Sequence, residues 1–136
     1  TQSRSSAASD VYKRQLMNHP KVERVSHPSV ASDLAKERAD KYLSGGCGGL
    51  MGFEIKGGIE AGKQFINSLE MFYHVANIGD SRSLAIHPAS TTHSQLNEEE
   101  LLSAGVTPGY VRLSIGLEHL DDIKDDLTQA LDKVSV

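Results

Sequence analysis

The sequence predicts an α+β fold, in which a small, mainly antiparallel β-sheet has helices packed on one face. Segments in which apolar and polar residues alternate take turns with segments of helical spacing, in the order strand then helix along the chain. Because each strand alternates, each is expected to turn one face to the core and the other to solvent or to a site. The helices carry apolar stripes that such a sheet can cover.

The length of 136 residues fits one domain. There is no Trp, so the core is expected to be mostly aliphatic. A net charge of -4 and a pI near 5.8 argue against a nucleic-acid partner. No run is long enough to span a bilayer, and no signal-peptide pattern opens the sequence. The one cysteine, Cys47, excludes an internal disulfide framework, suits a reducing cytoplasm and is interpreted as a loop thiol.

The first fifteen residues are rich in Ser, Ala and charge and show no period. We expect residues 1–15 to be a disordered or non-native leader, and residues 16–136 to be the domain. Because the domain starts near Leu16 without a beginning of its own, we interpret it as a fragment of a larger protein.

The first half of the domain is expected to hold two strands and two helices. A strand covers residues 22–28, and Ser32 can cap a helix over about residues 33–43. A second strand covers residues 51–55, and Gly57-Gly58 turns the chain into the next helix. The apolar face of that helix consists of Ile59, Gly62, Ile66 and Leu69.

The second half continues the alternation. Residues 75–78 are expected to be extended, and Leu84 and Ile86 share one face of the third main strand. Asn97 can cap a helix in a capping box with Glu100. The last strand places Val111, Leu113, Ile115 and Leu117 on one face. The closing helix is expected to bury Leu120, Ile123, Leu127, Leu131 and Val134, and to leave the acidic pair Asp125 and Asp126 in solvent.

Arg112 lies inside the last strand, on the face opposite to Val111 and Leu113. A guanidinium in this position must be paired or must await an anion, and its planar fork matches a carboxylate. Two readings stay open: a binding site for a small anion, or a salt bridge with an acid of the closing helix. Asn77 precedes Gly79 in a turn, and its amide can serve the same anion or the turn itself.

Two other patterns have plainer explanations. Residues 57–64 resemble a phosphate-binding loop, but Gln64 stands where a Ser or Thr would bind magnesium, so a glycine-led helix start is preferred. His87, His93 and His119 lack the helical spacing of zinc ligands. We therefore expect no metal site, and no catalytic residue is assigned.

Two segments carry a family resemblance. Residues 76–96 read Ala-Asn-Ile-Gly-Asp-Ser-Arg-Ser-Leu and then His-Pro-Ala-Ser-Thr-Thr-His-Ser-Gln-Leu, and resemble the C-terminal signature of the Cys/Met-metabolism pyridoxal-phosphate enzymes. Residues 111–118, Val-Arg-Leu-Ser-Ile-Gly-Leu-Glu, resemble the second C-terminal signature of that family. The Thr-Thr-His-Ser-Gln ending and the Asn before Ile-Gly-Asp are most similar to O-acetylhomoserine sulfhydrylases. The similarity covers about residues 16–136.

The resemblance implies the C-terminal small domain of a fold-type-I transferase of transsulfuration and methionine biosynthesis, cytoplasmic and homotetrameric. Such an enzyme converts O-acetyl-L-homoserine and sulfide or a thiol into homocysteine or a thioether, and releases acetate. By the same resemblance, Arg112 holds the substrate α-carboxylate, Asn77 helps to bind it, and Thr92 lines the pocket. Pyridoxal 5'-phosphate and its Schiff-base lysine are expected in a large N-terminal domain outside this sequence, so the chain by itself is expected to be inactive.

Other classes of function stay open. A stand-alone module could bind a small carboxylate through Arg112 and Asn77 without catalysis. A structural or assembly domain is the third possibility. The residues do not decide which acyl-homoserine or which thiol an enzyme of this kind would use.

Overall fold

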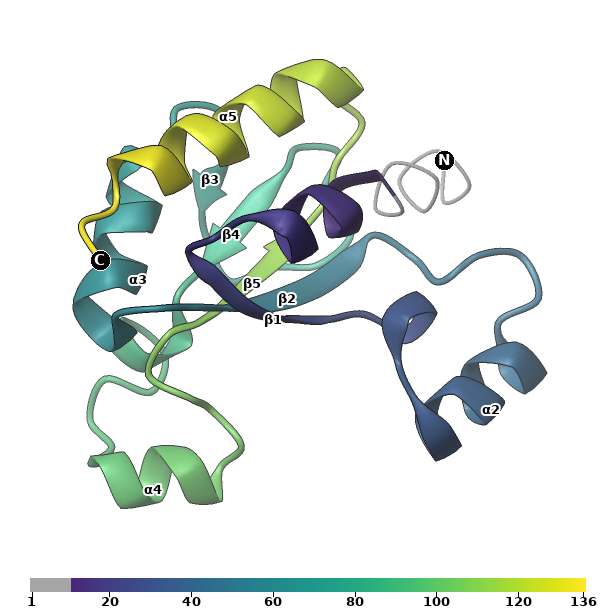
Figure 1. The fold of residues 1–136 in the computed structure, drawn as a ribbon, viewed down its shortest axis with the longest axis horizontal. Coiled ribbons are helices and arrows are strands. Elements are labelled where there is room, and N and C mark those ends of the chain that lie inside the picture. Colours follow the sequence, from purple (N-terminus) through teal and green to yellow (C-terminus); the bar gives the residue numbers. More distant parts are fainter. Residues whose placement is uncertain (1–10) are drawn as a thin grey trace.

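A computed structural model describes residues 11–136 of the chain as a five-stranded sheet with helices on both sides (Figure 1). Residues 11–18 are helical. The chain then forms β1 (Val22–Ser26), a 3-10 turn η1 (Pro28–Val30), α2 (Asp33–Tyr42), β2 (Leu50–Ile55), α3 (Gly58–Ser68), β3 (Tyr73–His74), β4 (Leu84–Ile86), η2 (Pro88–Ser90), α4 (Glu98–Ser103), β5 (Tyr110–Ser114) and α5 (Leu120–Lys133).

The strands lie in the order β1-β2-β5-β4-β3. The pairs β1/β2, β2/β5 and β4/β5 are antiparallel, and β3/β4 is parallel. The prediction of a mainly antiparallel α+β fold is therefore confirmed. The last strand in the sequence lies at the centre of the sheet, where Arg112 is paired with Gly52 on one side and with Ile86 on the other.

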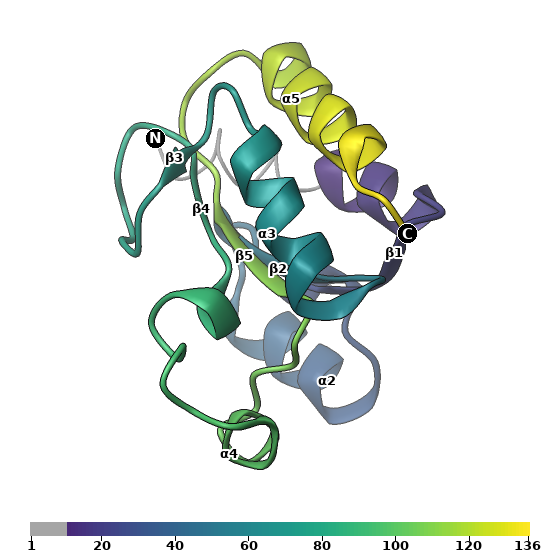
Figure 2. The same cartoon turned by 90° about the vertical axis from the view of Figure 1, so that its left-hand side faces the viewer.

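One face of the sheet forms the core. It contributes Met51, Phe53, Ile55, Ala85, Val111 and Leu113, which belong to one buried apolar cluster. Helices α3 and α5 cover this face (Figure 2). Phe53 of β2 meets Phe65 of α3 edge to face, with ring centroids 5.3 Å apart, an arrangement that aromatic pairs favour.

The covering helices bury most of the faces that their spacing predicts, although Ile59, Leu69 and Leu120 are only partly buried. In α5, Ile123, Leu127 and Leu131 are buried as expected, and Val134 just beyond the helix is buried as well. The expectation for Asp126 is wrong, because this carboxylate is buried in the fold. In α3, Gly62 and Ile66 are buried, together with Ala61 and Phe65, which the predicted face did not include. Local capping is confirmed in α4, where Asn97 and Glu100 form the capping box.

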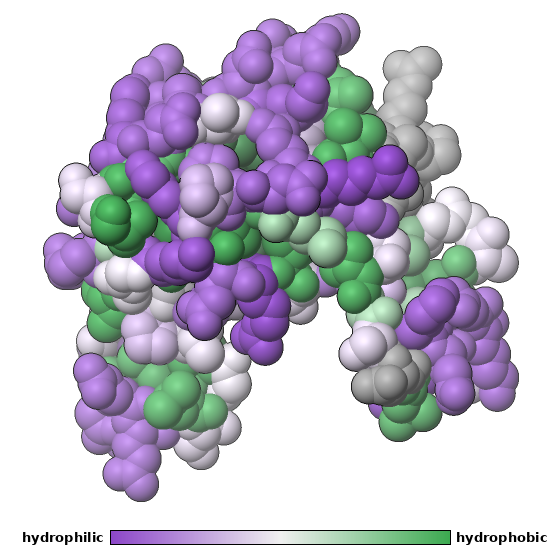
Figure 3. Space-filling model, in the orientation of Figure 1, coloured by the Kyte–Doolittle hydropathy of each residue, from purple (hydrophilic) through white to green (hydrophobic). Residues whose placement is uncertain are grey.

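Helices α2 and α4 lie on the other side of the sheet from α5 in both views (Figures 1 and 2). The expectation that helices cover one face therefore holds for the core-forming helices and not for these two. Leu34 and Tyr42 of α2 are exposed. A space-filling view shows the molecule hollowed between the parts that carry α2 and α4 (Figure 3).

Two segments differ from their predicted conformation. The structure describes residues 11–15 of the predicted leader as part of a helix, with Tyr12 fully buried in the core cluster beside Leu16. Disorder is therefore not found for this part, whereas residues 1–10 lie outside the described residues. Residues 75–78, expected to be extended, form a loop, and the short strand of this region lies just before them at Tyr73–His74.

Candidate functional site

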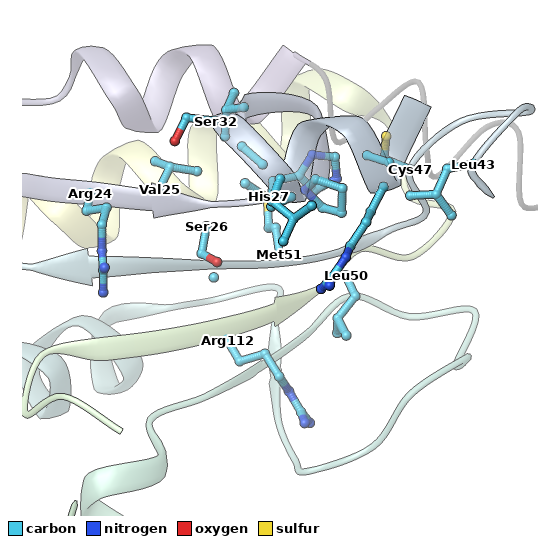
Figure 4. A pocket seen from close by; sticks show the side chains of 18 of the residues that line it. Arg24, Val25, Ser26, His27, Ser32, Leu43, Cys47, Leu50, Met51 and Arg112 are labelled. Atoms are coloured by element: carbon cyan, nitrogen blue, oxygen red, sulfur yellow. The ribbon is translucent and has the colours of Figure 1, made fainter. Parts of the chain in front are cut away.

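A groove of about 1400 Å³ lies on the face of the sheet opposite to the core. Its walls come from β1, η1, α2 and β2, and its central-strand residues are Tyr110 and Arg112 of β5. Arg24, Leu50 and Arg112 extend to the same side of the strands (Figure 4). The groove therefore joins apolar side chains of α2 to arginines of the sheet.

Arg112 is one of the residues that line this groove. Because side chains alternate along a strand, Val111 and Leu113 enter the core and Arg112 emerges on the other face, as predicted. Arg112 is partly buried, and no carboxylate among the described side chains lies within 4.0 Å of its nitrogens. The alternative of a salt bridge with the closing helix is thus not found in the described part of the chain. The guanidinium keeps its capacity for an anion.

Tyr110 is a groove residue that the sequence analysis did not single out. Its ring lies across Gly52, since a side-chain carbon at Gly52 would overlap the Tyr110 hydroxyl. Burial raises the pKa of Tyr110, against the opposing effect of the nearby Arg112 and Arg24 charges. A signal for it existed, because Tyr110 is two positions before Arg112 and therefore shares its face.

The structure brings Asn77 and Arg112 together. Arg112 Nη2 donates to the Asn77 backbone carbonyl over 3.4 Å, a long hydrogen bond. The Asn77 side-chain oxygen accepts from the Ile78 N–H at 2.8 Å, which serves the turn. The turn role considered for Asn77 is therefore present, whereas service of its amide to an anion stays a prediction, because the atom that meets Arg112 is the main-chain oxygen.

The loop that carries Asn77 is stiffened by its own charges. Asp80 accepts from the Arg82 backbone N–H (2.9 Å), Nε (3.1 Å) and Nη2 (2.9 Å). These hydrogen bonds lower the pKa of Asp80 to about 2. The Arg82 guanidinium also lies 4.5 Å from the ring centre of Tyr73, a cation–π contact.

Thr92 lies in the turn that follows η2, and it is exposed. Its hydroxyl is 2.8 Å from His93 Nδ1. No hydrogen bond among the described residues joins Thr92 to Arg112 or Asn77. The structure therefore brings together two of the three predicted site residues, and the binding roles of all three stay predictions.

His87 is a structural residue. It is fully buried, with Nε2 2.7 Å from the Pro108 carbonyl and Nδ1 2.8 Å from the Ser90 hydroxyl. Because a carbonyl only accepts, Nε2 carries the proton and Nδ1 accepts from Ser90. Burial lowers the pKa of His87. Within residues 11–136, no group of three His, Cys, Asp or Glu side chains is arranged to hold a metal ion.

The helix that follows Gly57-Gly58 is explained by packing. Both glycines have positive φ, 95° and 64°, as a sharp strand-to-helix turn requires. Gly62 faces the His87 ring so closely that a side chain would overlap it. Lys63 is exposed and pairs with Glu60 at 2.8 Å. These contacts support the glycine-led helix start that the sequence analysis preferred.

The groove offers no lysine among the described residues that line it. Lys56, the lysine that follows β2, donates to the Pro20 carbonyl at 2.6 Å. The described side chains therefore do not fit a covalent attachment site for pyridoxal phosphate within this groove. In the described part of the chain, no helix has the length and apolar character needed to cross a membrane.

The fold and the two signature segments agree with a comparison against known families. Residues 2–132 match the Cys/Met metabolism PLP-dependent enzymes, and the chain belongs to this family. The match extends into the first fifteen residues, which the sequence analysis treated as a leader.

Individual relatives are sulfur amino-acid enzymes. The chain is 56% identical over 120 residues to O-acetyl-L-homoserine sulfhydrylase of Leptospira meyeri, covering 88% of this chain and 27% of that protein. It is 51% identical over 116 residues to O-acetyl-L-homoserine sulfhydrylase 1 of Thermus thermophilus, covering 85% and 28%. It is 44% identical over 119 residues to an L-methionine gamma-lyase of Fusobacterium nucleatum, covering 88% and 30%. The chain thus spans less than a third of the length of these relatives.

A solved structure shares the fold. It is the crystal structure of a putative O-acetylhomoserine (thiol)-lyase from Campylobacter jejuni, which contains N'-pyridoxyl-lysine-5'-monophosphate. The TM-score is 0.85 at 42% identity, over 95% of this chain and 31% of that one.

Proposed function

We propose that this chain is the C-terminal small domain of an O-acetylhomoserine sulfhydrylase-like enzyme, and that it holds the α-carboxylate of the amino-acid substrate. The Arg112 guanidinium carries this proposal. It stands on the central strand, lines a groove, and has no carboxylate partner among the described residues. A partly buried cation in this state gains most from a small anion.

Arg112 would act by binding and positioning. Its two parallel N–H groups match the two oxygens of a carboxylate and so fix the plane of the bound group. Asn77 lies beside it and can add its side-chain amide N–H groups to the same anion, whereas Thr92 is proposed to line the pocket by family resemblance only. Holding a substrate in one orientation lowers the entropic part of a reaction barrier.

The chemistry of the cofactor is consistent with substrate binding by this chain and cofactor attachment by another domain. Pyridoxal phosphate, when bound, supplies an electron sink for carbanion chemistry. No lysine is found among the described residues that line the groove. We therefore assign the covalent attachment of pyridoxal phosphate to a large domain outside this chain. We also propose that the intact enzyme is cytoplasmic and homotetrameric. Leu34, Tyr42 and Leu50 are exposed apolar residues at the groove that such a larger assembly could cover.

The proposal is tested by Arg112→Leu in the full-length enzyme that contains this chain. Loss of a bidentate charged contact worth about 3 kcal/mol predicts a rise of roughly 100-fold in KM for O-acetyl-L-homoserine. Arg112→Lys keeps the charge but not the two parallel N–H donors, so its KM should lie between those of the unchanged enzyme and Arg112→Leu. Arg14→Leu removes an exposed arginine outside the groove and should leave KM unchanged.

Steady-state kinetics of acetate release at saturating sulfide provides the measurement. An unchanged KM in Arg112→Leu would remove Arg112 from the site. A fall in kcat of Arg112→Leu with both O-acetyl-L-homoserine and L-methionine, at an unchanged KM for each, would also count against a carboxylate-binding role.

A further inference from the structure

Glu118 lies four residues beyond the end of β5, and both oxygens of its carboxylate accept hydrogen bonds from Ser83. Its Oε1 accepts from the Ser83 backbone N–H at 2.6 Å, and its Oε2 accepts from the Ser83 hydroxyl at 2.8 Å. Ser83 is fully buried and Glu118 is partly buried. Charged acceptors make the stronger hydrogen bonds, and two of them on one residue fix its orientation. We call this pair the Glu118–Ser83 clamp.

The backbone around the clamp is tightly joined as well. The Gly116 N–H donates to the Ser83 hydroxyl oxygen at 3.0 Å, and the Leu117 N–H donates to the Ser81 carbonyl at 2.9 Å. A side chain at Gly116 would overlap the Ser81 carbonyl oxygen. The segment that follows β5 therefore lies directly against residues 81–83, with no room for a side chain between them at Gly116.

Residues 81–83 end the loop that presents Asn77 to Arg112. The remainder of this loop is exposed around Asn77. Its inner Asp80–Arg82 pair stiffens it, and Arg82 joins it to the edge strand β3 through the Tyr73 ring. The clamp joins the loop to the segment that follows β5. It does so beyond Ser114, the last residue of β5, and Arg112 is two residues before this end. Movement of the clamp would therefore change the 3.4 Å separation between Arg112 and the Asn77 carbonyl.

We propose that Glu118 and Ser83 are positioning residues for the carboxylate site, which act by holding the Asn77 loop beside Arg112. This inference rests on the proposed function, because it assigns the clamp to the site that Arg112 forms. The clamp does not touch substrate. Displacements of about 1 Å at a binding group are enough to weaken substrate orientation severely.

The test uses Glu118→Ala and Ser83→Ala in the full-length enzyme. Each variant is expected to raise KM for O-acetyl-L-homoserine about tenfold, and to change kcat less than about threefold. Glu118→Gln keeps one acceptor for the Ser83 N–H and can donate to the Ser83 oxygen, so it should recover most of the lost affinity. Glu99→Ala removes an exposed glutamate of α4 and serves as the matched control.

A double variant separates positioning from simple stabilisation. If the clamp acts through Arg112, then Glu118→Ala should raise KM little further when Arg112 is already Leu. Additive effects in this double variant, or equal losses in all kinetic constants of Glu118→Ala, would overturn the inference. Should Glu118→Ala not fold, Glu118→Gln and Ser83→Ala decide on the same criteria.

The two proposals fail differently. If Arg112→Leu raises KM and the clamp variants do not, the clamp inference is wrong and the carboxylate site stands. If Arg112→Leu leaves KM unchanged, the proposed function is wrong, and the clamp inference is lost with it.

Discussion

The buried carboxylate of Asp126 gives the sharpest prediction about stability. It lies on α5 and accepts hydrogen bonds from the backbone of residues 70–72, which follow the end of α3. Its Oδ1 accepts from the Glu70 N–H at 2.8 Å and from Gln129 Nε2 at 2.8 Å. Its Oδ2 accepts from the Met71 N–H at 2.9 Å and the Phe72 N–H at 3.2 Å. One side chain thus satisfies three consecutive backbone donors.

Asp126→Ala removes the partner of all three donors. A buried donor left unsatisfied costs about 1–3 kcal/mol, and partial access of water to the Glu70 end reduces the sum. We expect the free energy of unfolding to fall by about 3–5 kcal/mol, a large share of the roughly 5–15 kcal/mol typical of a domain. Asp126→Asn should lose about half as much, because its amide nitrogen faces backbone donors.

Urea unfolding followed by circular dichroism measures this difference at neutral pH. The matched control is Asp125→Ala, which removes the neighbouring, exposed aspartate of the same helix and should change the free energy by less than about 0.5 kcal/mol. A loss below 1 kcal/mol in Asp126→Ala, at an unchanged slope against urea, would refute the reasoning.

The buried His87 ring supports two further predictions. Burial lowers the pKa of His87 in the folded chain, so below about pH 6.5 the unfolded chain takes up a proton that the folded chain resists. Stability should therefore fall as the pH drops from about 6.5 toward the folded pKa, and His87→Asn should flatten this part of a urea-midpoint profile; an equal slope in both proteins would contradict it. Gly62→Ala places a methyl group in the ring, and should destabilise by about 1–3 kcal/mol although alanine favours helix; a higher melting temperature would show that the ring can move.

Local patterns were the predictable part of this protein. The Asn97–Glu100 capping box needs four neighbouring residues and nothing else, so the sequence specifies it completely. The side of the sheet that Arg112 faces follows from the two-residue period of a strand. Both features are read from short segments, and both agree with the structure.

Features that depend on distant segments were not predictable in this way. In the sequence, Asp126 is one more acid on a polar helix face, and its burial depends on backbone donors more than fifty positions away. Strand β3 has two residues, too few for any period to show, and its parallel pairing with β4 is set by the loop between them. Tyr12 and Leu16 have helical spacing, but the composition of the segment before Leu16 concealed it. The contact of Arg112 with Asn77 uses a main-chain oxygen, which carries no residue signature.

The central place of β5 has a consequence for synthesis on the ribosome. Without residues 110–114, the antiparallel β1/β2 pair and the parallel β3/β4 pair have no hydrogen-bonded edge in common. Both fragments then expose open edges that invite pairing with other chains. Strand β5 pairs with β2 and β4 in one step, so the sheet is completed only after its other four strands have been made, by the same segment that delivers Arg112.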